Sequence, residues 1–369
     1  MSLNILALAN EGVQKLHPYQ AGKPVDELER ELGIRNIVKL ASNENPLGLS
    51  ESVKLALQNE LSELTRYPDA NGYYLKKALA HKYGVDISQI TLGNGSNDLL
   101  ELIARAFVSR AHEVIFAQHA FVVYPLVTQA IGATAVAVPA INYGHDLDAM
   151  VTAISEKTKL IFIANPNNPT GTFLEPDALY AFLKKVPATV LVVLDEAYFE
   201  YAPVERRGNA ITWITEFPNL IVSRTFSKAY GLAGLRVGYS ISHPEVADIL
   251  NRVRQPFNCN ALALKAAEVA LNDVEHLQKS IALNNEGMAD LSAFFTQKNL
   301  EFIPSMGNFI TVNVGKSGDE VYQSLLQQGV IVRPITGYGL ANHLRISIGT
   351  HSENQRFKVA LIHVLNLEN

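Results

Sequence analysis

The chain has 369 residues, of which 48% are hydrophobic and 18% charged, a composition typical of a soluble globular protein. Because single hydrophobic cores stop growing at roughly 250–300 residues, we expect two lobes with a site between them. The formal net charge of -5 gives no general reason to expect nucleic acid or an anionic membrane as a partner. Cys259 is the only cysteine, which excludes an intrachain disulfide and an all-cysteine metal site and fits a reducing cytoplasm.

The N-terminal segment is predicted to be an arm that joins the small lobe. We place it at residues 1–45, and its Pro- and Gly-containing segments, His17–Tyr19 and Gly22–Pro24, favour irregular structure. No segment of the sequence approaches the roughly 20 apolar residues that span a bilayer, and no metal site is predicted.

Residues 46–245 are predicted to form a large α/β lobe, because short apolar runs alternate there with amphipathic stretches. Thr189–Leu194 is apolar on both faces, as a strand of a helix-covered, mostly parallel sheet must be. The expected strands are Gln89–Leu92, Glu113–Ala117, Ala133–Val138, Lys159–Ala164, Ala188–Leu194, Leu220–Arg224 and Val237–Ile241.

Residues 246–369 are predicted to form a smaller α+β lobe, because the rhythm changes there to long helical stretches followed by short strands. The expected helices are Ala261–Leu271, His276–Lys298, Asp319–Gln328 and Ser352–Leu365, and the expected strands are Glu301–Val314, Val330–Pro334 and His343–Ile348.

A carboxylate, Asp195, directly follows a fully apolar strand. In a doubly wound sheet, ligands bind beyond the carboxyl ends of the strands, so this is a place to look for a site. A carboxylate at that depth is costly unless it meets a positive partner, and a pyridinium nitrogen would be one. Capping of a following helix explains the residue equally well when it is considered alone.

A lysine, Lys228, also follows a predicted strand, within a segment that contains Thr225, Ser227 and Arg236. Lysine becomes nucleophilic when its amine is desolvated or lies near other cations. The arrangement therefore suits a Schiff base beside a bound phosphate. A solvated surface lysine is the ordinary alternative.

Two further turns follow predicted strands. Gly93–Asn97 precedes an amphipathic helix, and free N–H groups at a helix start bind anions. It is not a dinucleotide fingerprint, because Asp98 occupies the position of the third glycine. Asn165–Gly171 contains two Asn-Pro bonds, which restrict the backbone and are compatible with a cis peptide. Simple turns remain the alternative for both segments.

In this order, Asn168–Gly171, Asp195–Tyr198 and Thr225–Arg236 resemble the fold-type I aminotransferases, which use pyridoxal 5′-phosphate (PLP). Four other segments resemble the histidinol-phosphate aminotransferase family, and together the resemblance covers about Tyr19 to Gly349. These segments are Leu16–Pro24, Ser42–Gly48, Arg66–Asp69 and Leu344–Gly349. The implied fold has a large lobe with a mixed, mostly parallel sheet and a smaller α+β lobe. The implied enzyme is a cytoplasmic homodimer that converts L-histidinol phosphate and 2-oxoglutarate to imidazole acetol phosphate and glutamate.

The resemblance also implies roles for individual residues. Lys228 would carry PLP and move the proton, Asp195 would pair with the pyridine nitrogen, and Tyr198 would join Asn168 in holding the ring hydroxyl. Phe121 would stack on the ring, where the family commonly has Tyr. The implied phosphate-binding residues are Gly95, Ser96, Asn97, Thr225, Ser227 and Arg236, with Tyr67 reaching in from the neighbouring subunit. The implied substrate-binding residues are Tyr19, Asn43, Arg333 and Arg345.

Three other functions fit parts of this pattern. An aromatic amino-acid aminotransferase or a threonine-phosphate decarboxylase-like enzyme would share the motifs around PLP. A non-catalytic PLP-binding regulatory module is disfavoured, because 369 residues leave no room for a separate DNA-binding domain and the Lys, Asp and Arg set is complete.

Overall fold

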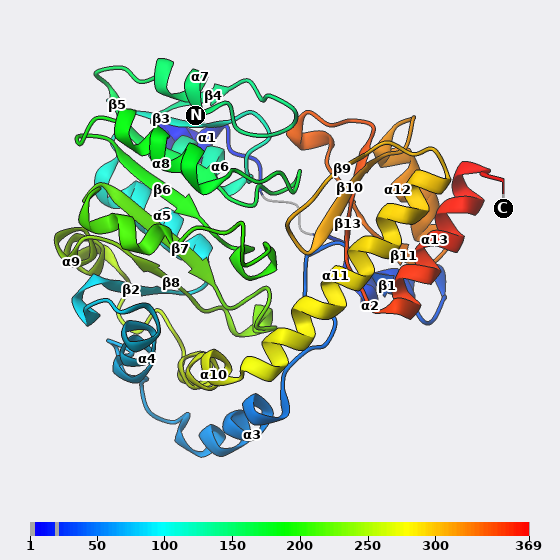
Figure 1. The fold of residues 1–369 in the computed structure, drawn as a ribbon, viewed down its shortest axis with the longest axis horizontal. Helices are drawn as coiled ribbons and strands as arrows, with labels where there is room; N and C mark the ends of the chain where they lie inside the picture. The colour runs from blue at the N-terminus through cyan, green and yellow to red at the C-terminus, as the bar shows by residue number, and fades with distance from the viewer. Residues whose placement is uncertain (1–3, 19–21, 369) are drawn as a thin grey trace.

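The computed structural model describes residues 4–18 and 22–368, which form two lobes connected by a long helix (Figure 1). This helix, α11 (Val274–Gln297), extends from the large lobe into the small one, where Leu291 and Phe295 are buried. The predicted two-lobe α/β organisation with a mixed sheet is confirmed. No helix within the described ranges is long and apolar enough to cross a membrane.

The large lobe contains a seven-stranded sheet in the order β2-β8-β7-β6-β5-β3-β4. Strand β8 is antiparallel to both of its neighbours, and all other adjacent strands are parallel. Each strand coincides with a predicted run to within a few residues. The strands are β2 (Ile90–Gly93), β3 (Glu113–Ala117), β4 (Thr134–Val138), β5 (Thr158–Ala164), β6 (Leu191–Asp195), β7 (Leu220–Thr225) and β8 (Gly238–Ile241).

Helices cover both faces of this sheet, which explains why its central strands are apolar at successive positions. On β6, Val192 and Leu194 join the core on one face, whereas Val193 joins the core on the other. Helices of the first core are α3 (Glu51–Glu60), α4 (Tyr73–Tyr83), α7 (Leu147–Thr152), α8 (Pro176–Lys185) and α10 (Ala261–Asn272). Those of the second are α5 (Ser96–Phe107), α6 (Val123–Ile131) and α9 (Pro244–Val253).

Helix α10 lies beyond residue 245, where the sequence rhythm predicts the start of the small lobe. Three of its alanines, Ala263, Ala266 and Ala267, are nevertheless fully buried in the first core of the large lobe. Figure 1 likewise shows α9 and α10 beside the large sheet. By these contacts both helices belong with the large lobe, and we propose that the lobes divide near the start of α11 instead. Small alanine side chains allow α10 to pack closely there, a feature that periodicity alone does not reveal.

The small lobe contains a four-stranded antiparallel sheet in the order β12-β13-β10-β9 and a two-stranded parallel pair, β1 with β11. Its strands are β1 (Val38–Lys39), β9 (Phe302–Ile303), β10 (Phe309–Asn313), β11 (Val330–Ile331), β12 (Arg333–Pro334) and β13 (His343–Ser347). Helices α12 (Gly318–Gln327) and α13 (His351–Leu365) pack with α11 around this core.

Two predicted strands of the small lobe are each divided in the structure. The first is interrupted by the turn that follows Pro304, a residue that cannot donate to a strand ladder. The second changes partners at Val332, because β11 pairs with β1 and β12 pairs with β13. Such a change of partner leaves no trace in the alternation of side chains.

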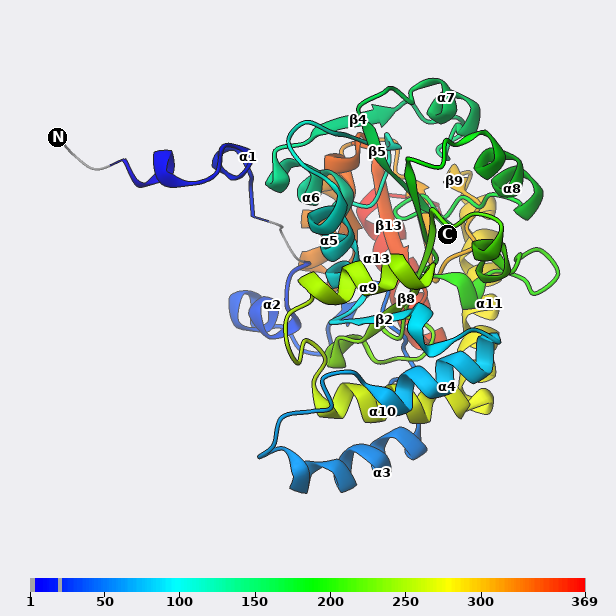
Figure 2. The same cartoon turned by 90° about the vertical axis from the view of Figure 1, so that its left-hand side faces the viewer.

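The N-terminal arm begins with η1 (Ile5–Leu8), which extends away from the body of the molecule (Figure 2), and continues with α1 (Glu11–Gln14), which packs against α6. It continues with α2 (Val25–Leu32), so the expectation of irregular structure is wrong for that segment. Leu28 of α2 is buried against the small lobe, and β1 pairs there with β11. The remaining short helices are η2 (Leu61–Glu63), η3 (Ile87–Gln89), η4 (Phe199–Tyr201), η5 (Ala210–Thr215), η6 (Ala233–Leu235) and η7 (Thr336–Tyr338).

Candidate active site

An open cavity of about 1000 Å³ lies between the lobes, at the carboxyl ends of β5, β6 and β7. This is the place where an open α/β sheet binds its ligands. Most of the residues predicted for the site line it. They are Asn43, Ser96, Asn97, Phe121, Asn168, Asp195, Tyr198, Thr225, Ser227, Lys228, Arg236, Arg333 and Arg345.

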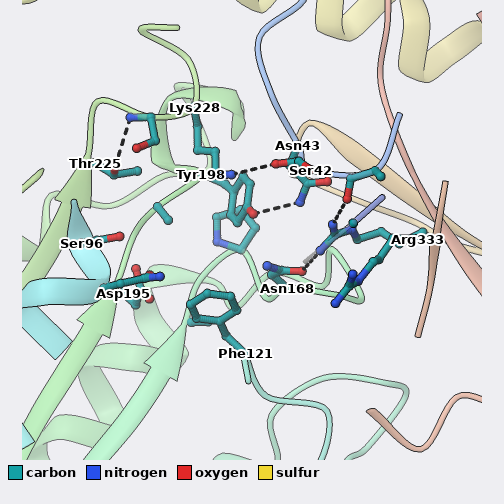
Figure 3. Close-up of a pocket in the computed structure, with 18 of the residues that line it drawn as sticks. Ser42, Asn43, Ser96, Phe121, Asn168, Asp195, Tyr198, Thr225, Lys228 and Arg333 are labelled. Carbon is teal, nitrogen blue, oxygen red and sulfur yellow. Dashed lines mark hydrogen bonds between the residues drawn. The ribbon is translucent and has the colours of Figure 1, made fainter. Parts of the chain in front are cut away.

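Lys228 is half-buried at one side of the cavity, opposite Phe121 (Figure 3). Its Nζ donates a hydrogen bond of 3.2 Å to the carbonyl oxygen of Ser42. Burial, together with the positive charge of Arg345, lowers the pKa of this amine to about 7. A substantial fraction of Lys228 is therefore neutral near pH 7, as a nucleophilic amine must be.

Asp195 is the last residue of β6 and is 4% exposed. Its Oδ2 accepts a hydrogen bond of 2.9 Å from Tyr124 Oη, whereas its buried Oδ1 has no partner among the described residues. Burial raises the pKa of this carboxyl to about 6. An unpartnered carboxylate oxygen at a cavity wall fits a positively charged ligand group such as a protonated pyridine nitrogen.

A cradle for an anion lies where α5 begins. Arg236 Nη1 donates to Ser227 Oγ at 3.1 Å, and the Ser227 N–H donates to Thr225 Oγ1 at the same distance. Gly95 has a φ of 82°, and a Cβ at this position would clash with the Arg236 guanidinium. A helix N-terminus, an arginine and two hydroxyls form the environment that a phosphate monoester requires.

The small lobe contributes a second group of polar side chains. Arg345 donates from Nη1 to Asn168 Oδ1 and from Nη2 to the Ala41 carbonyl oxygen, both at 2.6 Å. Asn43 Nδ2 donates to Tyr198 Oη at 2.9 Å, and burial raises the pKa of that phenol to about 12. Tyr198 therefore keeps its proton at neutral pH and remains able to donate it in a hydrogen bond.

A buried ion pair lies directly behind the site. Glu196 and Arg224 are 5% and 2% exposed, and Arg224 Nη2 lies 2.7 Å from Glu196 Oε2. The Arg224 guanidinium also lies over the Phe199 ring, 3.5 Å from its centre. Since side chains alternate along a strand, the neighbours of this pair, Asp195 and Thr225, point to the cavity. The pair thus joins the two strand ends that carry site residues.

The remaining predicted site residues are Gly95, Tyr67 and Tyr19. Gly95 adjoins the cavity beneath Arg236, as described above. Tyr67 is 82% exposed outside the cavity and stacks on Phe257 with ring centres 4.6 Å apart. Tyr19 lies outside the described residues.

Tyr124 and Tyr338, which none of the sequence motifs indicated, also line the cavity. Tyr124 lies three residues after Phe121, nearly one helical turn away, a spacing that could have indicated it. Tyr338 reaches the cavity from η7 in the small lobe, and no local pattern marks it.

The fold and the site therefore define an α/β enzyme whose cavity combines a lysine amine of lowered pKa with an adjoining cluster of anion-binding groups. Residues 35–361 match the family described as aminotransferase class I and II. The chain belongs to this family, as its motifs predicted.

Individual relatives are similar over nearly their whole length. The chain is 64% identical over 358 residues to histidinol-phosphate aminotransferase 1 of Idiomarina loihiensis, covering 97% of this chain and 98% of that protein. It is 59% identical over 365 residues to histidinol-phosphate aminotransferase 2 of Pasteurella multocida, covering 99% and 100%. Among solved structures, histidinol-phosphate aminotransferase from Sinorhizobium meliloti in complex with PLP is similar with a TM-score of 0.90 and 30% identity, covering 96% and 97%.

Proposed function

We propose that this chain is a PLP-dependent enzyme that transfers the amino group of L-histidinol phosphate to 2-oxoglutarate, with imidazole acetol phosphate and glutamate as products. Relatives with 56–64% identity over at least 97% of this chain carry the name of this enzyme. The proposed cofactor matches a solved relative that contains it.

The observation that carries the choice of substrate is the pairing of two arginines. Arg333 on β12 and Arg345 on β13 are opposite partners in an antiparallel ladder, and both line the cavity. Guanidinium groups bind phosphate and carboxylate in the same bidentate geometry. One wall can therefore receive the phosphate of histidinol phosphate in one half-reaction and a carboxylate of 2-oxoglutarate in the other.

The residues of the cavity fit PLP in each of its parts. When bound, this cofactor serves as the electron sink for the reaction, and the protein supplies orientation and proton transfer. Asp195 would bind the ring nitrogen through its unpartnered oxygen, Phe121 would stack on the ring, and the cradle around Arg236 would hold the phosphate. Lys228 Nζ would anchor the cofactor and, once released, move the proton from the substrate Cα.

We also propose a homodimer with shared sites. Tyr67 is 82% exposed, and its ring stacks on Phe257, itself 39% exposed. An exposed aromatic pair of this kind is suited to an interface with a second copy of the chain. The single buried cysteine supports the further proposal that the enzyme works in the cytoplasm.

The substrate assignment is tested by incubating the PLP-loaded protein separately with histidinol phosphate, histidinol, phenylalanine and threonine phosphate. We expect the highest kcat/KM for histidinol phosphate, with glutamate formed in step with loss of the donor. A preference for phenylalanine would favour an aromatic aminotransferase, and release of CO₂ from threonine phosphate would favour a decarboxylase. Failure of every donor to change the visible absorbance of the bound cofactor would favour a non-catalytic module.

A further inference from the structure

A histidine of the large lobe contacts the small lobe at the edge of the cavity. His119, which follows β3, is 7% exposed, and its Nδ1 lies 2.7 Å from the carbonyl oxygen of Tyr338. A carbonyl oxygen only accepts, so Nδ1 carries the proton and donates it. This hydrogen bond connects the loop that carries Phe121 with η7 of the opposite lobe.

The position of His119 is fixed from two sides. Asn167 Nδ2 donates to the backbone oxygen of His119 at 3.0 Å and also to Thr170 Oγ1 at 2.8 Å. The Tyr143 ring lies between two histidines, with its centre 6.3 Å from that of His119 and 5.9 Å from that of His343 on β13. His119 is therefore held by a turn of the large lobe on one side, and on the other it lies near Tyr143, whose ring meets His343 of the small lobe edge-on.

The hydrogen bond from His119 fixes the backbone of Tyr338. This tyrosine lines the cavity and comes from the small lobe, as do Arg333 and Arg345, the residues to which the substrate anions are assigned above. Burial raises the pKa of Tyr198, and Tyr338 is among the neighbouring groups that raise it further, so the two phenols lie within electrostatic reach. None of the roles given above to cofactor-binding residues uses Tyr338.

We propose that Tyr338 is a specificity-determining residue that contacts the ring of the amino donor, and that His119 is the positioning residue that holds it in place. The inference rests on the proposed function, in which the donor bears an imidazole. A phenol offers an apolar face for a flat ring and a hydroxyl that both donates and accepts. Glutamate has no ring. A contact between Tyr338 and the donor ring would therefore favour histidinol phosphate and leave the binding of glutamate unchanged.

The test compares Tyr338→Phe, His119→Ala and His119→Asn with wild type, using histidinol phosphate and glutamate as alternative donors. For Tyr338→Phe and His119→Ala we expect KM for histidinol phosphate to rise about threefold to tenfold, the loss expected for one net hydrogen bond. We expect kcat, and both parameters for glutamate, to stay within about twofold. His119→Asn should recover most of the loss, because its side-chain amide can donate to the same carbonyl oxygen.

The matched control is His112→Ala, which removes a histidine at the opposite end of β3. Within the described residues, the hydrogen bonds of the His112 ring are made with Ser109. We expect this variant to behave as wild type. The inference is overturned if His119→Ala weakens both donors equally, if His119→Asn recovers nothing, or if the visible absorbance of the bound cofactor changes. Each of these results indicates a purely structural role.

Failure of the proposed function gives a different result. If wild-type protein does not use histidinol phosphate, the substrate assignment is wrong. The same variants are then compared with phenylalanine and glutamate, which again differ by a ring. A selective rise in KM for phenylalanine would support the contact with Tyr338, and an equal effect on both donors would overturn it.

Discussion

Tyr124 and Asp195 share a hydrogen bond of 2.9 Å that occupies one oxygen of a buried carboxylate, and the other oxygen has no hydrogen-bond partner in the part of the chain that the structure describes. A phenol donates a single hydrogen, so this bond orients the carboxylate without neutralising it. Burial keeps the pKa of Asp195 raised to about 6. A positive group at the unpartnered oxygen would lower this pKa and thereby be stabilised itself.

Replacing Asp195 by Asn is expected to preserve cofactor binding but to remove the charge that keeps the ring nitrogen protonated. The rate at which an amino donor changes the cofactor absorbance should fall roughly 100-fold or more, as for loss of a preorganised electrostatic group. Tyr124→Phe is the comparison, because it keeps the charge and removes only the orienting bond, so its loss should be smaller. Stopped-flow absorbance measures both. Wild-type rates in the Asn variant would remove Asp195 from the mechanism.

The lowered pKa of Lys228, about 7, predicts how cofactor capture depends on pH. Only the neutral amine reacts with the aldehyde of PLP, and it becomes the major form as the pH rises through 7. The rate at which PLP-free protein acquires the visible absorbance of the bound cofactor should therefore increase between about pH 6 and 8 and then level off. An amine with an ordinary pKa near 10.5 would instead continue to gain rate up to that pH. A profile of that second kind would contradict the prediction.

Lys228→Ala is expected to abolish turnover, because it removes both the covalent anchor and the base. Loss of a general base alone typically costs about 10²–10⁴ in rate. Steady-state transamination above roughly one hundredth of the wild-type rate would therefore show that another residue performs this chemistry. Lys82→Ala is a useful comparison, since Lys82 hydrogen-bonds Tyr230 and does not line the cavity.

The parts of the fold that repeat a local pattern could be predicted from the sequence. Strand β3 has the predicted bounds, because a short run of apolar residues that is buried on both faces leaves few alternatives. The packing of α10 on the large sheet could not be predicted, because it depends on which distant surface receives its alanines. The change of strand partner at Val332 could not be predicted either, because it depends on the positions of β1 and β13, which are distant in the sequence from each other.

The site follows the same division. The positions of Asp195 and Lys228 in the cavity could be predicted because Asp195 ends one strand and Lys228 follows the next, and the topology of the sheet brings these strand ends together. Tyr338 comes from the other lobe, and its place depends on a hydrogen bond to His119 more than 200 positions away in the sequence. No local spacing contains that information.

Tyr67 is predicted to act in the site of a neighbouring subunit, because it is exposed and lies outside the cavity of its own chain. Mixing inactive Lys228→Ala protein with an inactive Tyr67→Ala protein, under conditions that exchange subunits, should regenerate activity. In a hybrid dimer one site receives both wild-type residues and the other receives neither. Mixing Lys228→Ala with Asp195→Asn is the matched control, since both residues lie in one cavity. If exchange is demonstrated and no activity returns, each site is built from one chain.

Arg345→Ala tests whether one guanidinium serves both substrates. Arg345 is 7% exposed, and it lies opposite Arg333 in the strand ladder. If both substrates contact it, kcat/KM for histidinol phosphate and for glutamate should fall together. Each decrease should correspond to a loss of roughly 1.5–3 kcal/mol in transition-state binding free energy, as for a lost charged hydrogen bond. Histidinol lacks the phosphate, so it should already be a poor donor for wild type and should change little in the variant.

Arg356→Ala, at an exposed position of α13, controls for the general loss of a positive charge. Thermal unfolding of the Arg345 variant checks that the hydrogen bonds from its guanidinium to Asn168 and Ala41 are not needed for folding. Loss of activity toward glutamate alone would assign the phosphate to Arg333 instead. Equal use of histidinol and its phosphate by wild type would contradict the histidinol-phosphate assignment and leave the family unchanged, because phosphate recognition would then contribute nothing to the choice of donor.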